Sequence, residues 1–93
     1  MKPLFDPGYV VATASVALEI DPHYVNLLME RHLNGDWGDL DTHDFAENER
    51  SLREQQGGRL HSSYDTPQGS VWIITDNLGY KEACTTVLLP SDY

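Results

Sequence analysis

Three β-rich runs in the last third of the chain constrain its fold more than any other feature. Residues 59–64, 71–75 and 84–89 are rich in β-branched and aromatic side chains, and turn-forming sequences separate them. Because connections this short join neighbouring antiparallel strands, we predict a three-stranded antiparallel meander. Both faces of the middle run are apolar, which indicates a central strand covered on both sides, with Trp72 in the core.

The first half of the chain predicts a short strand followed by helices. An apolar run at 10–13 suits the strand, and residues 15–20 suit one or two helical turns with Ser15 as the N-cap. Asp21 followed by proline is a helix-start signal, and Asn34 followed by glycine is a helix-end signal. We therefore expect one helix to run between these two signals.

A second, more polar helix is predicted to begin at Asp41 or Thr42 and to stop before the glycine pair that starts at Gly57. Its apolar stripe is thin, because only Phe45 and Leu52 contribute large apolar side chains to it. This helix should therefore lie on the surface and touch the core along one edge.

The order of the elements predicts a single α+β domain over residues 1–93. Its short N-terminal strand and its two or three helices should pack on the C-terminal three-stranded antiparallel meander. A chain of 93 residues with 40% hydrophobic residues can bury one modest core. No run approaches the ~20 apolar residues of a membrane-spanning helix, and the first residues lack the apolar region of a signal peptide.

Charge and cysteine content limit the classes of partner and compartment. Fifteen acidic and six basic residues give a net charge of −9. A protein that follows phosphates needs a basic stripe, so this balance disfavours direct binding to nucleic acid or to anionic membranes. The single cysteine, Cys84, permits no intrachain disulfide and is expected to be a buried small hydrophobic residue. It favours a reducing, cytoplasmic location.

No residue pattern in the chain predicts catalysis, a metal or a cofactor. The sequence has no phosphate-binding loop, dinucleotide fingerprint or nucleophile elbow. His61 precedes two serines in a strand, but neighbouring strand residues point to opposite faces and cannot form a dyad. His43 lies among aspartates that could hold a divalent ion weakly, although a solvated acidic loop explains it better, and no register supplies the ligands of an EF-hand. We therefore predict that the protein is not an enzyme.

Six of the fifteen acidic residues lie between positions 35 and 49, and no lysine or arginine interrupts them. One interpretation is structural, because acids at a helix start complement its dipole and keep a small domain soluble. The other is functional: dense carboxylates imitate the charge of a nucleic-acid backbone and occupy the groove of a nucleic-acid-binding protein. The candidate partner-binding residues are Asp36, Trp37, Asp39, Asp41, Asp44, Glu47 and Glu49.

Trp37, which stands close to two glycines and two aspartates, also has two interpretations. It either folds back and fills the gap between the two helices, or it is an exposed aromatic anchor inside an acidic rim. The second arrangement suits docking to a surface that carries arginine or lysine. The sequence alone leaves both interpretations open.

Several motifs are spread over nearly the whole chain. They include the block Gly35-Asp36-Trp37-Gly38-Asp39, the ending Leu88-Leu89-Pro90, Arg31-His32, Asn48-Glu49-Arg50 and Trp72-Ile73-Ile74-Thr75. With these motifs the chain resembles a family of small bacterial proteins, labelled plasmid-related, that are encoded on plasmids, integrative elements and phages. Residues 76–83 depart from the family pattern. The resemblance implies a mobile-element setting, in which small acidic proteins without enzymatic activity often inhibit host defence.

The residues and the resemblance together predict a non-catalytic protein that binds a basic, nucleic-acid-binding host protein or complex. It would inhibit a host defence complex as an anti-CRISPR or antirestriction protein, in the manner of a DNA mimic. The alternative is an accessory or regulatory domain without an inhibitor role. Such a domain would self-associate, as a homodimer, through a β edge of the meander near residues 84–89.

Overall fold

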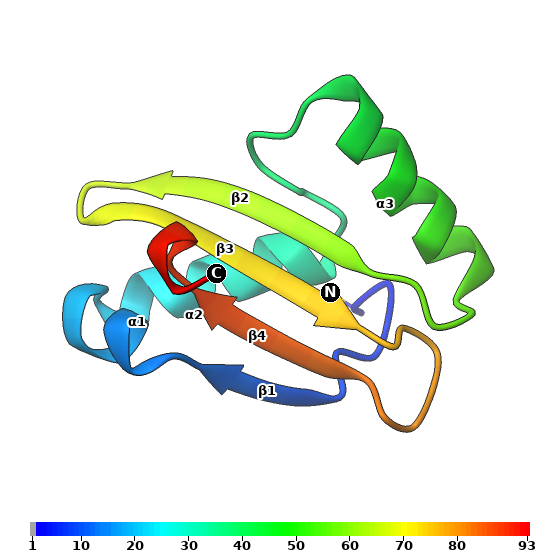
Figure 1. Ribbon diagram of the computed structural model, residues 1–93, viewed down its shortest axis with the longest axis horizontal. Helices are drawn as coiled ribbons and strands as arrows, with labels where there is room; N and C mark the ends of the chain where they lie inside the picture. The colour runs from blue at the N-terminus through cyan, green and yellow to red at the C-terminus, as the bar shows by residue number, and fades with distance from the viewer. Residues whose placement is uncertain (1) are drawn as a thin grey trace.

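Four strands form one sheet in the order β1-β4-β3-β2 (Figure 1). The computed structural model describes residues 2–93. β2 (Leu60–Thr66), β3 (Gly69–Asp76) and β4 (Cys84–Leu88) form the predicted antiparallel meander. β1 (Tyr9–Ala12) lies parallel to β4. The fold is therefore α+β, as predicted, and the N-terminal strand extends the meander at one edge.

β4 is an interior strand of the sheet, because β1 and β3 lie on its two sides. The prediction that residues 84–89 offer an edge for self-association is therefore wrong, since both edges of β4 are already paired. Within residues 2–93 the outer strands are β1 and β2. Cys84, at the start of β4, is partly exposed rather than buried as predicted.

Two helices begin at the start signals that the sequence contains. α2 (Pro22–Leu33) follows Asp21, whose side chain accepts a hydrogen bond at 2.8 Å from the amide two residues later. α3 (Thr42–Glu54) follows Asp41, whose carboxylate accepts a hydrogen bond at 2.8 Å from the amide three residues later. Both predicted helix starts are confirmed, and each aspartate satisfies a backbone donor that the first turn leaves unpaired.

Two helix caps differ from those that the sequence predicts. α1 (Ala14–Glu19) is capped by the hydroxyl of Thr13 rather than by Ser15. α3 ends at Glu54, before the glycine pair as predicted, but its left-handed C-cap is Gln55, with a φ of 46°, and not a glycine. After β4 the chain finishes in a short 3₁₀ turn, η1 (Pro90–Asp92).

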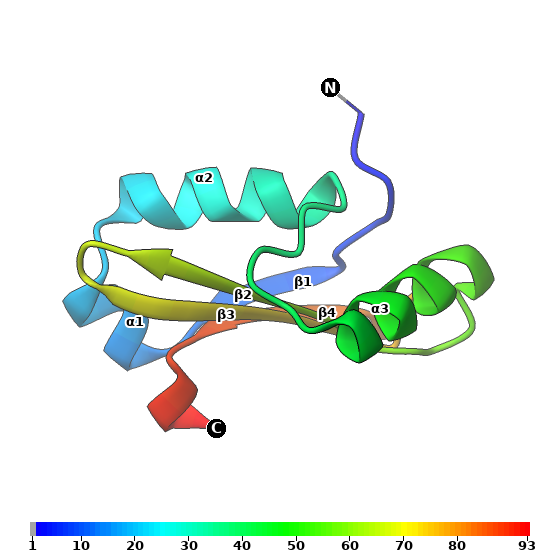
Figure 2. The same cartoon turned by 90° about the horizontal axis from the view of Figure 1, so that it is seen from above.

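α2 covers one face of the sheet, and the C-terminal turn lies against the other (Figure 2). The main core between helices and sheet consists of Val16, Ile20, Leu28, Tyr64, Val71, Ile73 and Val87. Trp72 points to the opposite face, where it is partly exposed between the rings of His61 and Tyr93. The predicted core position of Trp72 is therefore wrong, because no α-helix of the described residues covers that face of β3 (Figure 2).

α3 lies beside β2 at the edge of the sheet rather than over the face that α2 covers (Figures 1 and 2). Leu52 packs, as predicted, against a second core cluster of Phe5, Trp37, Leu60 and Leu78. Phe45 is 49% exposed, so the predicted apolar stripe is only half correct. The buried residue of α3 is instead Asn48, which is 3% exposed.

Candidate functional site

An open cleft lies where the C-terminal end of α2, the connector of residues 35–40 and β2 meet. Its hollow measures about 320 Å³. The residues that line it are Arg31, Asp36, Gly38, Asp39, Ser63, Tyr64 and Asp65. We call it the acidic cleft, because it brings three carboxylates (Asp36, Asp39 and Asp65) around one guanidinium.

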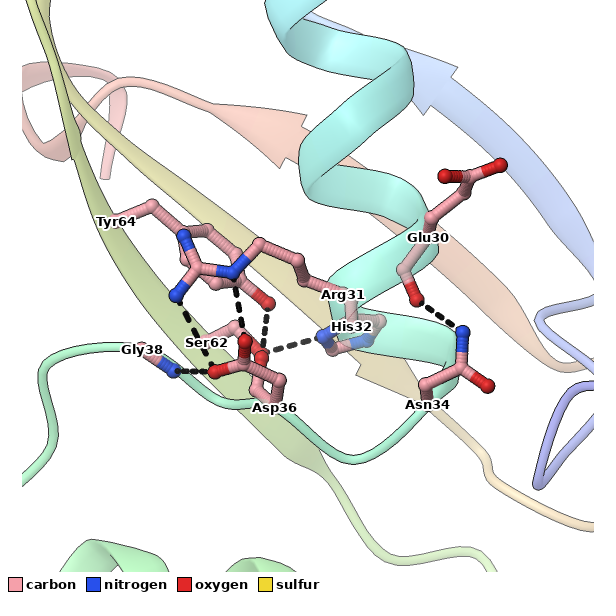
Figure 3. A network of polar contacts seen from close by, with 8 residues as sticks. All are labelled: Glu30, Arg31, His32, Asn34, Asp36, Gly38, Ser62 and Tyr64. Carbon is pink, nitrogen blue, oxygen red and sulfur yellow. Dashed lines mark hydrogen bonds and ion pairs between the residues drawn. The ribbon is translucent and has the colours of Figure 1, made fainter.

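Arg31 is the one cation that lines the acidic cleft, and it is already paired there. Its Nε donates to Asp36 at 2.7 Å and its Nη2 donates to the other carboxylate oxygen at 3.3 Å (Figure 3). The guanidinium carbon lies 4.7 Å from the centre of the Tyr64 ring, in a cation–π contact. The hydrogen bond from Arg31 lowers the pKa of Asp36, and the same bond raises the pKa of Arg31. Because both side chains are about half exposed, this pair orients groups more than it stabilises the fold.

The connector that carries Asp36 and Asp39 is held in place by backbone contacts. The hydroxyl of Tyr64 donates to the carbonyl of Asp36 at 2.6 Å, and burial raises the pKa of Tyr64 to about 12, so this donor keeps its proton. Gly38 has a φ of 74°, and a Cβ there would lie 2.0 Å from the carbonyl oxygen of Ser63. Only glycine therefore lets the connector pass this close to β2.

Asp39 and Asp65 face the acidic cleft from its two sides, and both are exposed. Neither forms an ion pair within residues 2–93, although Asp65 accepts a hydrogen bond from Ser70 at 2.8 Å. The cleft therefore has two unneutralised carboxylates beside an occupied arginine. No group of three His, Cys, Asp or Glu side chains in the described part of the chain could hold a metal ion. Sequence reasoning missed Asp65, because it lies on β2, far along the chain from the acidic segment.

The four acids at the start of α3 and along it have different roles, although the sequence presents them as one acidic run. Asp41 serves as the helix cap, and Glu47 pairs with Arg50 one turn later. Glu49 is partly buried. Of the four acids, Asp44 is the one exposed acid that, within residues 2–93, neither forms an ion pair nor caps the helix. The structure therefore places all six predicted acids along the β2 side of the molecule, but it uses Asp36, Asp41, Glu47 and Glu49 in internal contacts.

Trp37 is not an exposed anchor. Its side chain is 2% exposed, and it packs between the rings of Phe5 and His32, with centroid distances of 6.5 and 5.5 Å. Its indole Nε1 donates to Glu49 of α3 at 3.4 Å. Trp37 thus fills the space between α2 and α3, and its assignment as a partner-binding residue is wrong. The reason is the N-terminal segment, which supplies Phe5 as a packing partner.

His32 is the centre of a buried polar chain that the sequence analysis did not foresee. Its Nδ1 lies 2.6 Å from the hydroxyl of Ser62, and its Nε2 lies 2.9 Å from the hydroxyl of Thr75 (Figure 3 shows the Ser62 contact). Thr75 lies 2.7 Å from Thr85, which donates at 2.8 Å to the carbonyl of Pro7. All four side chains are buried to 0% exposure.

The carbonyl of Pro7 fixes the direction of every hydrogen bond in the series from Thr85 to Ser62. Thr85 uses its only proton on Pro7, so Thr75 must donate to Thr85. Nε2 of His32 must then donate to Thr75, which leaves Nδ1 to accept from Ser62. Burial lowers the pKa of His32 to about 4, so the ring is neutral at pH 7 and fits this arrangement.

The distance between His32 and Ser62 is the only feature that this pair shares with the histidine and serine of a catalytic triad. Both residues are sealed from solvent, and the second ring nitrogen of His32 contacts a threonine instead of a carboxylate. A serine nucleophile needs access to substrate and a base oriented by a third group. This network of hydrogen bonds therefore has a structural role: it satisfies the polar groups of the core. The sequence signal for it was the position of His32 on the apolar face of α2.

No helix within residues 2–93 is long and apolar enough to cross a membrane. No protein-family model, curated protein or solved structure matches the chain.

Proposed function

We propose that this protein is a non-catalytic binding protein that recognises a basic, nucleic-acid-binding host protein or complex through carboxylates. The observation that carries the proposal is the acidic cleft, in which Asp39 and Asp65 have no cation partner among residues 2–93 while the one arginine that lines the cleft is already bound to Asp36. An arginine or lysine of a partner would find two carboxylates on a connector that is already fixed to β2.

The charge of the whole molecule supports this choice of partner. A net charge of −9 attracts a basic surface over distances of about 10 Å at moderate salt. Asp44, which is exposed on α3, adds a carboxylate outside the acidic cleft, in a second hollow that Arg50 and Arg59 also line. A protein that occupies a nucleic-acid-binding groove needs negative charge on one side, because the groove has evolved to hold phosphates.

In a mobile-element setting, a protein of this kind acts in the host cytoplasm as an inhibitor of a defence complex, either a CRISPR or a restriction system. The inhibition needs no chemistry of its own: a bound acidic protein excludes the nucleic acid from the groove. The buried position of Ser62 and His32 supports a role without catalysis, since these residues form the nearest approach to a nucleophile and base.

Affinity capture from host lysate at low and high salt tests this function. We expect a nucleic-acid-binding protein to be captured at low salt and lost at high salt, because the contacts are carboxylate to guanidinium or ammonium. The purified partner should also lose its binding to nucleic acid when this protein is added. A partner that binds this protein and nucleic acid at the same time would contradict the proposal.

A further inference from the structure

The two outer edges of the sheet differ sharply. At the β2 edge, the backbone of Ser63 is paired with Trp37 and Asp39, and the backbone of His61 is paired with the side chain of Asn48. No segment within residues 2–93 pairs with the outer edge of β1, and all four of its residues are exposed. The β2 edge is thus paired at His61 and Ser63, whereas the β1 edge is open within residues 2–93 and is a free template for strand addition.

The outward backbone groups of β1 belong to Val10 and Ala12. The amide of Tyr9 donates to the carbonyl of Ala83 at 3.1 Å, and the amide of Thr13 donates to the carbonyl of Val87 at 3.0 Å. Backbone groups alternate in direction along a strand, so those of Val10 and Ala12 point away from β4. The free edge therefore offers two residues with unpaired donors and acceptors.

This edge is also the place where two copies of the chain can approach with the least repulsion. No charged residue occurs between Asp6 and Glu19, although the chain as a whole has a net charge of −9. Asp92 lies near one end of the edge, where it accepts hydrogen bonds from Thr13 and Ser15. Outer strands of monomeric proteins usually carry a lysine, a proline or a bulge that prevents pairing, and β1 has none of these.

An apolar hollow lies beside the free edge, on the helix side of the sheet. It is lined by Ala12, Val16, Ala17, Ile20, Pro22, Val25 and Asn26. Val10 is paired with Thr85 of β4, whose side chain lies in the buried layer under α2, so Val10 and Ala12 both face this side. A residue placed opposite Ala12 by an added strand would therefore lie over the hollow.

We propose that two copies of this protein pair through β1 in antiparallel orientation, about a twofold axis at Val11. In this register Val10 of one copy exchanges backbone hydrogen bonds with Ala12 of the second copy, and the reverse pair forms by symmetry. The side chain of Val10, which is 49% exposed, then covers the hollow beside Ala12 of the second copy. The two sheets become one continuous eight-stranded sheet.

The geometry favours a second copy as the occupant because the edge is complementary to itself. β1 supplies the donor, the acceptor and the apolar side chain, and the hollow beside it is formed by Ala12 together with residues of α1 and α2. Each of these features is used twice in the pair. The acidic clefts lie at the opposite edges, beside β2, so the dimer presents them at its two ends. The pairing does not depend on what those clefts bind.

Analytical ultracentrifugation over a range of protein concentrations tests the pairing. We expect the mass to rise from 10.5 kDa towards twice that value, and to do so more readily at high salt, which screens the repulsion between two acidic copies. This salt dependence is opposite to that expected for the acidic cleft, so failure of one proposal is distinguishable from failure of the other. A monomer at every concentration and salt would overturn the pairing.

Val10→Lys and Leu18→Lys form a matched pair of variants for the same experiment. Leu18 is 86% exposed on α1, and it belongs neither to β1 nor to the residues that line the hollow. Both variants reduce the negative charge by the same amount, so a purely electrostatic association would strengthen in both. We expect Val10→Lys to remain monomeric and Leu18→Lys to dimerise. A dimer that survives Val10→Lys would overturn the proposed interface.

Hydrogen exchange of the unmodified protein provides a second test that does not depend on the folding of a variant. The amides of Tyr9 and Thr13 are bonded within the monomer and should be protected at every concentration. The amides of Val10 and Ala12 should gain protection only as the dimer forms. A dimer in which these two amides still exchange freely would overturn the proposal.

Discussion

Asn48 pairs with the backbone of His61 as if it were a residue of a neighbouring strand. Its Nδ2 donates to the carbonyl of His61 at 2.8 Å, and its Oδ1 accepts from the amide of His61 at 3.0 Å. The side chain is 3% exposed. One amide thereby fixes a helix to the edge of the sheet, where it covers the backbone of His61 and holds the acids of α3 beside β2.

Replacement of Asn48 by alanine should destabilise the protein by about 2 to 4 kcal/mol, because a buried donor and a buried acceptor of His61 both lose their partner. Urea denaturation monitored by tryptophan fluorescence measures the free energy of unfolding. Asn34→Ala is the matched control, since Asn34 is exposed and the one side-chain hydrogen bond that it forms within residues 2–93 goes to the carbonyl of Glu30. Equal losses in the two variants would show that Asn48 does not fix α3.

Stability should fall as the pH is lowered from about 6.5 towards 4. His32 has a pKa of about 4 in the folded protein and an ordinary value of 6.5 when unfolded, so only the unfolded state binds its proton in this window. The lost stability amounts to about 3 kcal/mol for His32. Burial also lowers the pKa of His61, which adds to the slope in the same direction.

Denaturation at several pH values in His32→Gln and His43→Gln separates these contributions. His43→Gln is the control for the loss of an exposed imidazole. His32→Gln should remove most of the slope, whatever its effect on stability at pH 7. If the slope persists in His32→Gln, the buried chain from Ser62 to Pro7 does not hold a neutral imidazole.

The elements with local signals were the ones that the sequence predicted well. Asp21 and Asp41 start their helices because a capping side chain acts within one turn, and the meander follows from short turns between β-rich runs. The place of β1 was not predictable in this way. It pairs with β4, more than seventy residues along the chain, and no local pattern specifies a contact of that range.

The candidate site shows the same division between local and distant contacts. The acidic segment was visible in the sequence, but the sequence did not show that Asp36 binds Arg31 or that Asp65 joins the acidic cleft from β2. Trp37 is buried because Phe5 and His32 close around it from two other segments. A charge count treats all acids of a segment alike, whereas the fold divides them between caps, ion pairs and free carboxylates.

Gly38→Ala should disturb the acidic cleft as well as stability. The new Cβ would lie 2.0 Å from the carbonyl of Ser63, so the connector must move away from β2, at a cost of about 2 kcal/mol or more. Gly69→Ala is the control, because Gly69 also has a positive φ but its Cβ would meet no atom within 4 Å. The Gly69→Ala variant should lose only about 1 kcal/mol of unfolding free energy, which is the cost of holding an alanine at a positive φ. Thermal unfolding of both variants measures the difference, and equal losses would contradict the close approach.

The affinity of the captured partner for the double variant Asp39→Asn/Asp65→Asn is the measurement to make first. Its control, Glu19→Gln/Glu82→Gln, removes the same charge from exposed acids outside the acidic cleft. We expect the cleft variant to lose affinity by about tenfold or more at low salt, while the control loses much less, because only the cleft carboxylates contact the partner's cations. Unchanged affinity of the cleft variant, or the same loss in both variants, would show that the acidic cleft is not the binding site.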